Sequence, residues 1–192
     1  MAWAKNGSTT LTGTSDIIDI DPIDDKKFDI ILHHALYSGD SNSTFNLNSD
    51  TLINYARRSS YSGGADSTGI SQTKFSYDDS SVHDSLFAVT YMVNISTEEK
   101  LMISNQATIT TTGAGTAPAR AEQVQKWTNT SDAITAIKHT QSSGGGNYLT
   151  DSNVSVLGSD AVSSWTLQDG LIFYETDTNK EYILSNNTWT EL

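Results

Sequence analysis

The stretch Leu86–Ile95 reads LFAVTYMVNI and is the most apolar segment of this 192-residue chain. Its β-branched and aromatic residues favour a strand, and a nearly continuous apolar run is typical of a strand inside a sheet. The polar turn Thr97-Glu98-Glu99 follows, so the next segment, Lys100–Thr111, should return antiparallel to it. We therefore expect Leu86–Ile95 at the centre of a sheet, buried on both faces along part of its length.

Other short strand-like runs surround this segment, separated by clusters of Gly, Asn, Asp and Ser that are typical of turns. Phe28–Tyr37 is the clearest, and its alternation places Asp29 and His33 on one face and His34 on the other. The remaining expected strands are Ser8–Thr12, Ile17–Ile20, Thr44–Leu47, Leu52–Ser60, Gln72–Tyr77, Arg120–Thr128, Ala133–Thr140 and Asn153–Leu157. We expect Arg120–Thr128 and Ala133–Thr140 to pair with each other around the turn between them.

The composition favours a folded, all-β protein. Only 36% of the residues are apolar and 18% are charged, and much of the remainder is Ser, Thr, Asn and Gly, which compete with helical hydrogen bonds. Four Trp, eight Tyr and five Phe are more aromatic residues than a disordered chain carries. About ten short strands with turns between them predict an antiparallel β-sandwich, most simply a jelly roll, over residues 1–160.

The C-terminal residues form a separate pattern. Two apolar runs, Leu171–Tyr174 and Tyr182–Leu184, flank a polar turn, and a further turn leads into Thr188–Leu192. This pattern predicts a small β-meander over residues 161–192, joined to the sandwich through Gly158–Thr166. Because so small a meander buries little area, we expect it to pack on the sandwich, on a neighbouring subunit or on another protein. The expected contact residues are Trp165, Phe173, Tyr174, Tyr182 and Trp189.

Charge and cysteine content exclude several classes of function. The net charge of −12, with only eleven Lys and Arg, argues against a nucleic-acid surface. No run approaches the ~20 apolar residues of a membrane-spanning helix, and the N-terminus lacks the apolar core of a signal peptide. The chain has no cysteine, so a disulfide framework and a thiolate metal site are excluded. We expect a protein made in a cytoplasm, with neither nucleic acid nor a membrane as partner.

Candidate metal ligands are few. Asp19, Asp21, Asp24 and Asp25 crowd hard oxygen atoms into a short stretch, which suits Ca²⁺, although the glycine and terminal glutamate of an EF-hand loop are missing. The alternative, which we favour, is a charged turn with Pro22 at its corner. The histidines show no ligand-like spacing, so we expect them to be structural or solvated, with a proton-sensitive interface as the alternative. No cofactor is expected.

Catalysis has little support, because no serine lies in a G-x-S-x-G elbow and no glycine loop joins a strand to a helix. Binding is the stronger rival, since exposed aromatic side chains on the loops of a β-sandwich can stack on sugar rings. The candidates for glycan stacking are Tyr55, Tyr61, Tyr77, Trp127 and Tyr148. The alternative is that these side chains cap the edges of the sandwich or seal subunit contacts.

Two stretches resemble proteins of tailed bacterial or archaeal viruses. Residues 170–182, GLIFYETDTNKEY, followed by Trp189-Thr190, resemble a short C-terminal module of their structural and tail proteins. In the body of the chain, residues 3–11 (WAKNGSTTL), 55–59 (YARRS) and 126–130 (KWTNT) are similar to jelly-roll structural proteins of tailed viruses from aquatic hosts.

The resemblance implies a non-enzymatic virion protein, such as a capsid decoration or head-appendage protein. It would act through self-assembly, expected as a homotrimer, and through contact with the major capsid protein or other virion proteins. Arg57 and Arg58 are the expected contacts to an acidic partner, with solvated strand-face charges as the alternative. Two further functions stay open: a receptor- or carbohydrate-binding tail or fibre component that binds a host surface glycan, and a surface-layer or adhesin-type domain.

Overall fold

A computed structural model describes residues 3–39, 42–77, 84–109, 111–141, 146–160, 170–186 and 188–192. The described residues form fifteen strands and no helix, so the expected all-β class is confirmed. The chain divides into two compact units, Met1–Asp160 and Ala161–Leu192, and each is described by itself.

The first unit contains twelve strands in two antiparallel sheets. The larger sheet has eight strands in the order β1-β12-β3-β8-β9-β10-β5-β6, and the smaller has four in the order β2-β11-β4-β7. Their bounds are β1 Ala4–Thr10, β2 Ile17–Ile20, β3 Phe28–Leu36, β4 Ser43–Leu47, β5 Tyr55–Tyr61, β6 Ser67–Gln72, β7 Phe75–Ser76, β8 Ser85–Val93, β9 Lys100–Ile109, β10 Ala119–Trp127, β11 Ile137–Gln141 and β12 Asn153–Ser159.

The winding of this unit is that of a jelly roll. Strands β1-β12-β3-β8 form one layer and β2-β11-β4-β7 the other. Among the eight strands of these two layers, the chain changes layer at each step from β1 to β4, again from β7 to β8, then on reaching β11, and from β11 to β12. The first and last strands, β1 and β12, lie side by side. A jelly roll has eight strands in two such layers, so the topology accounts for eight of the twelve.

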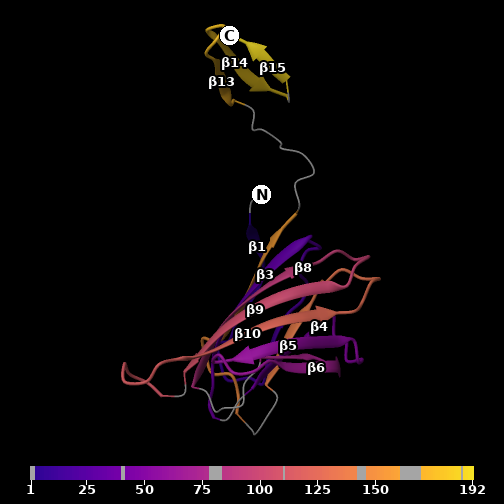
Figure 1. The fold of residues 1–192 in the computed structure, drawn as a ribbon, viewed down its shortest axis with the longest axis vertical. Coiled ribbons are helices and arrows are strands. Elements are labelled where there is room, and N and C mark those ends of the chain that lie inside the picture. The colour runs from indigo at the N-terminus through magenta and orange to yellow at the C-terminus, as the bar shows by residue number, and fades with distance from the viewer. Residues whose placement is uncertain are drawn as a thin grey trace. The chain divides into compact units, whose positions relative to one another are not determined.

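The other four strands extend one layer. The β5–β6 hairpin is inserted between β4 and β7, and β9–β10 between β8 and β11. Both insertions add to the edge of the large sheet beyond β8, in the order β9-β10-β5-β6, as Figure 1 shows. These four strands widen the large sheet, and the small sheet gains no strand from them.

An apolar core fills the space between the layers, and its largest side chains are aromatic. Phe45 and Phe75 of the small sheet lie with ring centroids 4.9 Å apart, and Tyr55 packs edge-on against Phe75 at 4.9 Å. Trp127 is fully buried, and its indole N–H donates to the Asp50 carboxylate at 2.7 Å. Offset and edge-to-face rings of this kind add to the stabilisation that burial of their area provides.

Two expectations about the strands need correction. Leu86–Ile95 does lie in the middle of the large sheet as β8, but only one of its faces is buried. Ala133–Thr140 does not pair with Arg120–Thr128: β11 pairs with β2 and β4 in the small sheet, whereas β10 pairs with β9 and β5. Residues 128–136 carry the chain across the sandwich, a path that turn residues alone did not indicate.

The second unit is the expected three-stranded meander, β13 Ile172–Glu175, β14 Lys180–Ser185 and β15 Thr188–Glu191. Both neighbouring pairs are antiparallel. Asn179 and Asn186 take left-handed backbone angles in its turns, which asparagine tolerates better than most residues. Leu184 is the buried side chain of this unit among its described residues.

Candidate functional site: the apolar outer face of the large sheet

The outer face of the large sheet, turned away from the small sheet, carries large apolar side chains in the open. Phe87 and Tyr91 of β8, Leu101 and Ile103 of β9, and Val124 of β10 are each 49–59% exposed. These five residues define the apolar outer face. Single exposed apolar residues are ordinary on a protein surface, but a contiguous set on adjacent strands marks an interaction site.

The register of the strands makes this set contiguous. Ile30 of β3 pairs with Tyr91, Tyr91 with Ile103, and Ile103 with Val124, so one apolar row crosses four neighbouring strands. Directly opposed side chains in a sheet have Cβ atoms about 5 Å apart, close enough to form one surface. Beside the row lies an apolar hollow of about 350 Å³, whose lining includes Trp3, Phe28, Tyr91, Leu101 and Ile103.

Charged pairs border the apolar outer face. Arg58, opposite Val124 on the next strand, lies 3.3 Å from Asp66, and Lys126 lies 2.8 Å from Glu99. Side chains in both pairs are 43–59% exposed, so each pair contributes little to stability. The two arginines expected at an interface are neighbours on β5, so their side chains point to opposite faces of the sheet. Arg58 lies at this border, whereas Arg57 donates to the Ser59 hydroxyl at 2.9 Å.

The inner faces of β9 and β10 carry several buried polar side chains. Ser104, Gln106, Thr108, Gln123 and Gln125 are all at most 5% exposed. Gln125 donates to the Gln123 side-chain oxygen at 2.5 Å, while neither amide atom of Gln106 has a hydrogen-bond partner among the described residues. Polar side chains are therefore buried on one face while apolar side chains are exposed on the other.

Lys100 begins β9 on the inner face and is fully buried. Its ammonium group donates to the backbone carbonyls of Ser96, Glu98 and Asn129 at 3.1, 2.9 and 2.6 Å. It also lies 5.4 Å from the Trp127 ring centroid, a cation–π contact. Burial lowers the pKa of Lys100. The side chain closes the turn between β8 and β9 rather than forming a binding site.

The aromatic residues expected to stack on glycans are mostly in the core. Tyr55, Tyr77, Trp127 and Tyr148 are at most 1% exposed, and Tyr61 is half-buried. The expectation of exposed rings at the sandwich loops is therefore wrong for four of the five. The reason is that these residues stand at strand ends, where a large ring turns inward to fill the space between the layers.

The terminal unit exposes its aromatic residues instead. Phe173, Tyr174 and Trp189 are 40–52% exposed, and Tyr182 is half-buried. Trp165, also expected as a contact residue, lies outside the described residues. The role of these side chains as subunit contacts stays a prediction, because each unit is described by itself.

The acidic residues do not converge on an ion. Among the described residues, no three His, Asp or Glu side chains come together as a metal site would need, and this includes Asp19, Asp21, Asp24 and Asp25. The segment follows the alternative interpretation, a charged turn, and the peptide bond before Pro22 is cis.

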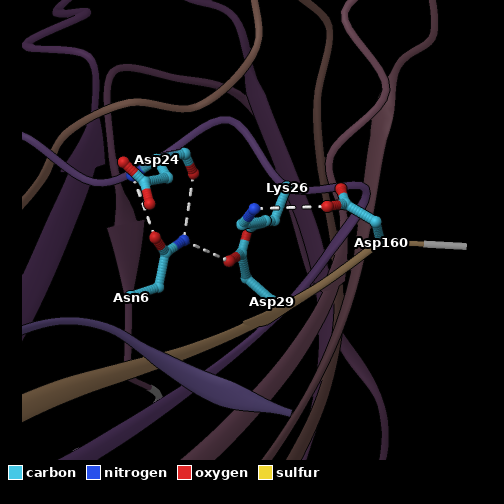
Figure 2. Close-up of polar contacts among 5 residues, drawn as sticks. All are labelled: Asn6, Asp24, Lys26, Asp29 and Asp160. Carbon is cyan, nitrogen blue, oxygen red and sulfur yellow. Dashed lines mark hydrogen bonds and ion pairs between the residues drawn. The ribbon is translucent and has the colours of Figure 1, made fainter. Parts of the chain in front are cut away.

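Asp24 belongs to a polar network around the buried Asp29, shown in Figure 2. The Asn6 amide donates to the Asp29 carboxylate at 2.9 Å and to the Asp24 carbonyl at 3.0 Å, and Lys26 pairs with Asp160 at 3.2 Å. Burial raises the pKa of Asp29 to about 6, although hydrogen bonds from Asn6 and Asn94 favour the ionised form. The network joins β1, β3 and the segment before β3, so its role is structural.

The structure brings together two histidines that the sequence did not connect. His33 of β3 and His139 of β11 come from opposite layers, and their ring centroids lie 4.2 Å apart. Both rings are fully buried, and no ring nitrogen has a hydrogen-bond partner among the described residues. Burial lowers the pKa of His33, and that of His139 to about 3. The alternation of Phe28–Tyr37 indicated an inward His33, but no sequence signal paired it with His139.

Comparison with protein-family models, with curated proteins and with solved structures found no match to this chain. Within the described ranges, no helix has the length and apolar character needed to cross a membrane.

Proposed function

We propose that the chain is a non-enzymatic structural protein of a virus particle, located in the virion, which acts by self-assembly through the apolar outer face. The observation that carries the proposal is the apolar row of Ile30, Tyr91, Ile103 and Val124, aligned by the strand register on a face that no other part of the described unit covers. The resemblance to structural proteins of tailed viruses supports the particle as its place of action.

The size of the face suits association. Five large side chains that are each about half exposed, with half-buried apolar neighbours such as Phe28 and Ile30, present several hundred Å² of apolar area. A stable protein interface buries about 800 Å² on each partner, much of it a polar border around an apolar centre. At roughly 25 cal/mol per Å², covering the apolar part would contribute on the order of 10 kcal/mol before the losses of association.

The occupant that fits is a second copy of the chain. In a ring of three copies, the apolar outer face of each copy can meet those of the other two around a common axis. Its border holds both signs of charge, Arg58 and Lys126 together with Asp66 and Glu99, so neighbouring copies in the ring can place opposite charges against each other. A homotrimer, as expected from the sequence, is the assembly we propose.

In this role, assembly multiplies weak contacts. A decoration protein that binds only the assembled capsid shifts the equilibrium toward it, and three copies on one symmetry axis bind more tightly than one. The terminal unit, with its exposed aromatic residues, would supply contacts to the major capsid protein or to other virion proteins. A surface-layer or adhesin-type domain could use the same face for self-association.

Light scattering on the purified chain tests the proposal. We expect a trimer for the unaltered chain, and a monomer when Ile103→Lys places a charge in the centre of the apolar row. Leu52→Lys is the matched control, because Leu52 is 67% exposed on the loop between β4 and β5 and lies outside this face. A monomeric unaltered chain, or a trimer that survives Ile103→Lys, would contradict assembly through this face.

Two further measurements separate assembly from location. A chain that ends at Asp160 should keep the trimer if the sandwich alone associates. Mass spectrometry of density-purified virus particles should detect the chain in fixed ratio to the capsid protein. Its absence from particles, with self-association intact, would favour the surface-layer or adhesin-type alternative.

A further inference from the structure

One face of the terminal meander gathers three aromatic rings. Phe173 of β13 and Tyr182 of β14 are directly paired, with ring centroids 6.3 Å apart. Trp189 of β15 meets Phe173 edge-on at 6.2 Å. Strand alternation puts these rings on the same face as Glu175, Lys180 and Glu191, and puts Tyr174 on the other.

The rings line a hollow of about 360 Å³ together with Glu175. Phe173 is 52% exposed and Trp189 40% exposed, so their rings are open to solvent. The Oε2 atom of Glu175 accepts hydrogen bonds from the Thr178 and Tyr182 hydroxyls. No hydrogen bond within the described part of the chain uses its other oxygen, Oε1, which is left to accept from a ligand.

The exposed area of the rings and the volume of the hollow fit a small molecule better than a protein. Aromatic side chains bury about 150–250 Å² each, so three half-exposed rings present about 300 Å², well below the ~800 Å² per partner of a stable protein interface. The volume of the hollow falls in the ~300–1,000 Å³ range of small-ligand sites. An open aromatic floor with a carboxylate at its side suits a ligand that has one apolar face and hydroxyl groups around its rim.

The charge around the hollow narrows the class of ligand further. Glu175 lines the hollow and Glu191 lies on the same face, where it pairs with Lys180 at 2.9 Å. The chain as a whole carries −12 charges. An acidic site on an acidic chain repels anions, so sialic acids and uronic acids are disfavoured. A neutral pyranose, with C–H groups against Trp189 and a hydroxyl donated to Glu175, meets both the shape and the charge.

We propose that this face of the terminal meander binds a neutral carbohydrate, with Trp189 and Phe173 as the stacking surface and Glu175 as the hydrogen-bond acceptor. The site lies in the terminal unit and the apolar outer face lies in the sandwich, so in this proposal the chain assembles through one unit and binds glycan through the other. Several copies in one assembly would raise the avidity of a weak single site.

The test uses the full chain on an array of immobilised oligosaccharides, half neutral and half carrying sialic or uronic acids, followed by calorimetric titration of the best neutral binder. We expect binding to neutral sugars alone. Trp189→Ala should weaken binding at least tenfold and Glu175→Gln several-fold. Tyr182→Phe keeps the ring and should keep most of the affinity, and Tyr174→Ala, on the opposite face, should leave it unchanged.

Three outcomes would overturn the proposal: no neutral sugar bound by the unaltered chain, a preference for anionic sugars, or binding that survives both Trp189→Ala and Glu175→Gln. Light scattering on the same variants separates this site from the proposed function. An oligomer that dissociates on Trp189→Ala, without any sugar binding by the unaltered chain, would make the ring face a subunit contact. Assembly through the sandwich would then be tested by Ile103→Lys alone.

Discussion

Strands β9 and β10 differ from the strands of an ordinary sandwich sheet, because they bury several polar side chains and expose apolar ones. Their inner faces bury Ser104, Gln106 and Gln123, whereas their outer faces expose Leu101 and Ile103. In β12 of the same sheet the usual arrangement holds, with Val154 and Val156 buried inside and Ser155 half-buried outside. Exposed apolar area is unfavourable in water, which is why we propose that a second copy covers this surface.

The comparison also shows which part of the unit stabilises the fold. Most of the aromatic core lies between the jelly-roll layers, and the extension β9-β10-β5-β6 adds Tyr55, Met102 and Trp127 to it, with no further strand of the small sheet opposite the extension. Stability should therefore depend on the jelly-roll core and on the few apolar inner residues of the extension. Association should depend on the extension's outer face together with β8.

The largest expected effect comes from neighbouring residues on opposite faces of β9. Met102 is 2% exposed and faces inward, whereas Leu101 is 59% exposed. Met102→Ala should lower the free energy of unfolding by about 2–5 kcal/mol, because it leaves a cavity. Leu101→Ala should change the stability of the monomer by less than about 0.5 kcal/mol, yet weaken the oligomer. Chemical denaturation at fixed protein concentration measures both, and equal losses would contradict the assignment of the faces.

Acid should destabilise the sandwich through His33 and His139. The unfolded chain takes up protons below pH ~6.5, but burial lowers the pKa of His139 in the fold to about 3 and also lowers that of His33. The stability from these neutral rings is complete above pH 6.5 and is lost as the pH falls toward 3. The expected loss is about 1 kcal/mol per pH unit for each histidine.

Urea unfolding between pH 7 and 4 tests this contribution. His139→Phe, which keeps a ring against Phe45 (5.2 Å between centroids), should reduce the acid dependence. The control is His34→Gln, since His34 lies exposed on the outer face of the same strand as His33. An unchanged pH profile for His139→Phe would mean that the buried pair takes up protons without unfolding.

The stability that Asp29 contributes should change with pH in the opposite direction, and its total change should be smaller than that of the two histidines. Its pKa of about 6 in the fold exceeds the 3.8 of an unperturbed carboxyl, so the folded state holds the proton more tightly. Stability from this group is therefore highest below pH ~4 and falls, by at most about 3 kcal/mol, as the pH rises to 6.

The variant Asp29→Asn should remove this dependence, because the side chain no longer ionises. Asp24→Asn is the control, since the described contacts of Asp24 in this network use its backbone N–H and carbonyl. Thermal unfolding at pH 4 and pH 6.5 measures the difference. A variant with the same pH dependence as the unaltered chain would show that Asp29 is ionised throughout.

The smallest effect is expected at the border of the apolar outer face. Arg58→Ala breaks an exposed pair with Asp66 and should change the stability of the monomer by less than about 0.5 kcal/mol. If the border contributes to association, the same change should weaken the oligomer more at low salt than at high salt. Sedimentation at two ionic strengths measures this. If Arg58→Ala and the unaltered chain form the oligomer equally well at both, the contact involves only the apolar centre of the face.

Sequence reasoning could place much of the fold but little of the site. The alternation of Phe28–Tyr37 assigned Asp29 and His33 to one face, because side chains on a strand alternate between faces. It could not say that His139 from the other layer would meet His33, since that contact depends on how the two sheets stack. For the five aromatic residues at strand ends and loops, the sequence left open whether the rings are exposed or cap the sandwich, and four of the five lie in the core.

The sequence by itself determined the all-β class, the near-central strand Leu86–Ile95 and the terminal meander, because these follow from local alternation and turn residues. Only the tertiary structure decided that the outer face of β8 is open, that β9 and β10 bury polar side chains on their inner faces, and that Tyr91, Ile103 and Val124 form one row. An apolar strand looks the same in sequence whether one face or both are covered. What covers a face depends on strand order, which long-range pairing sets and local pattern does not record.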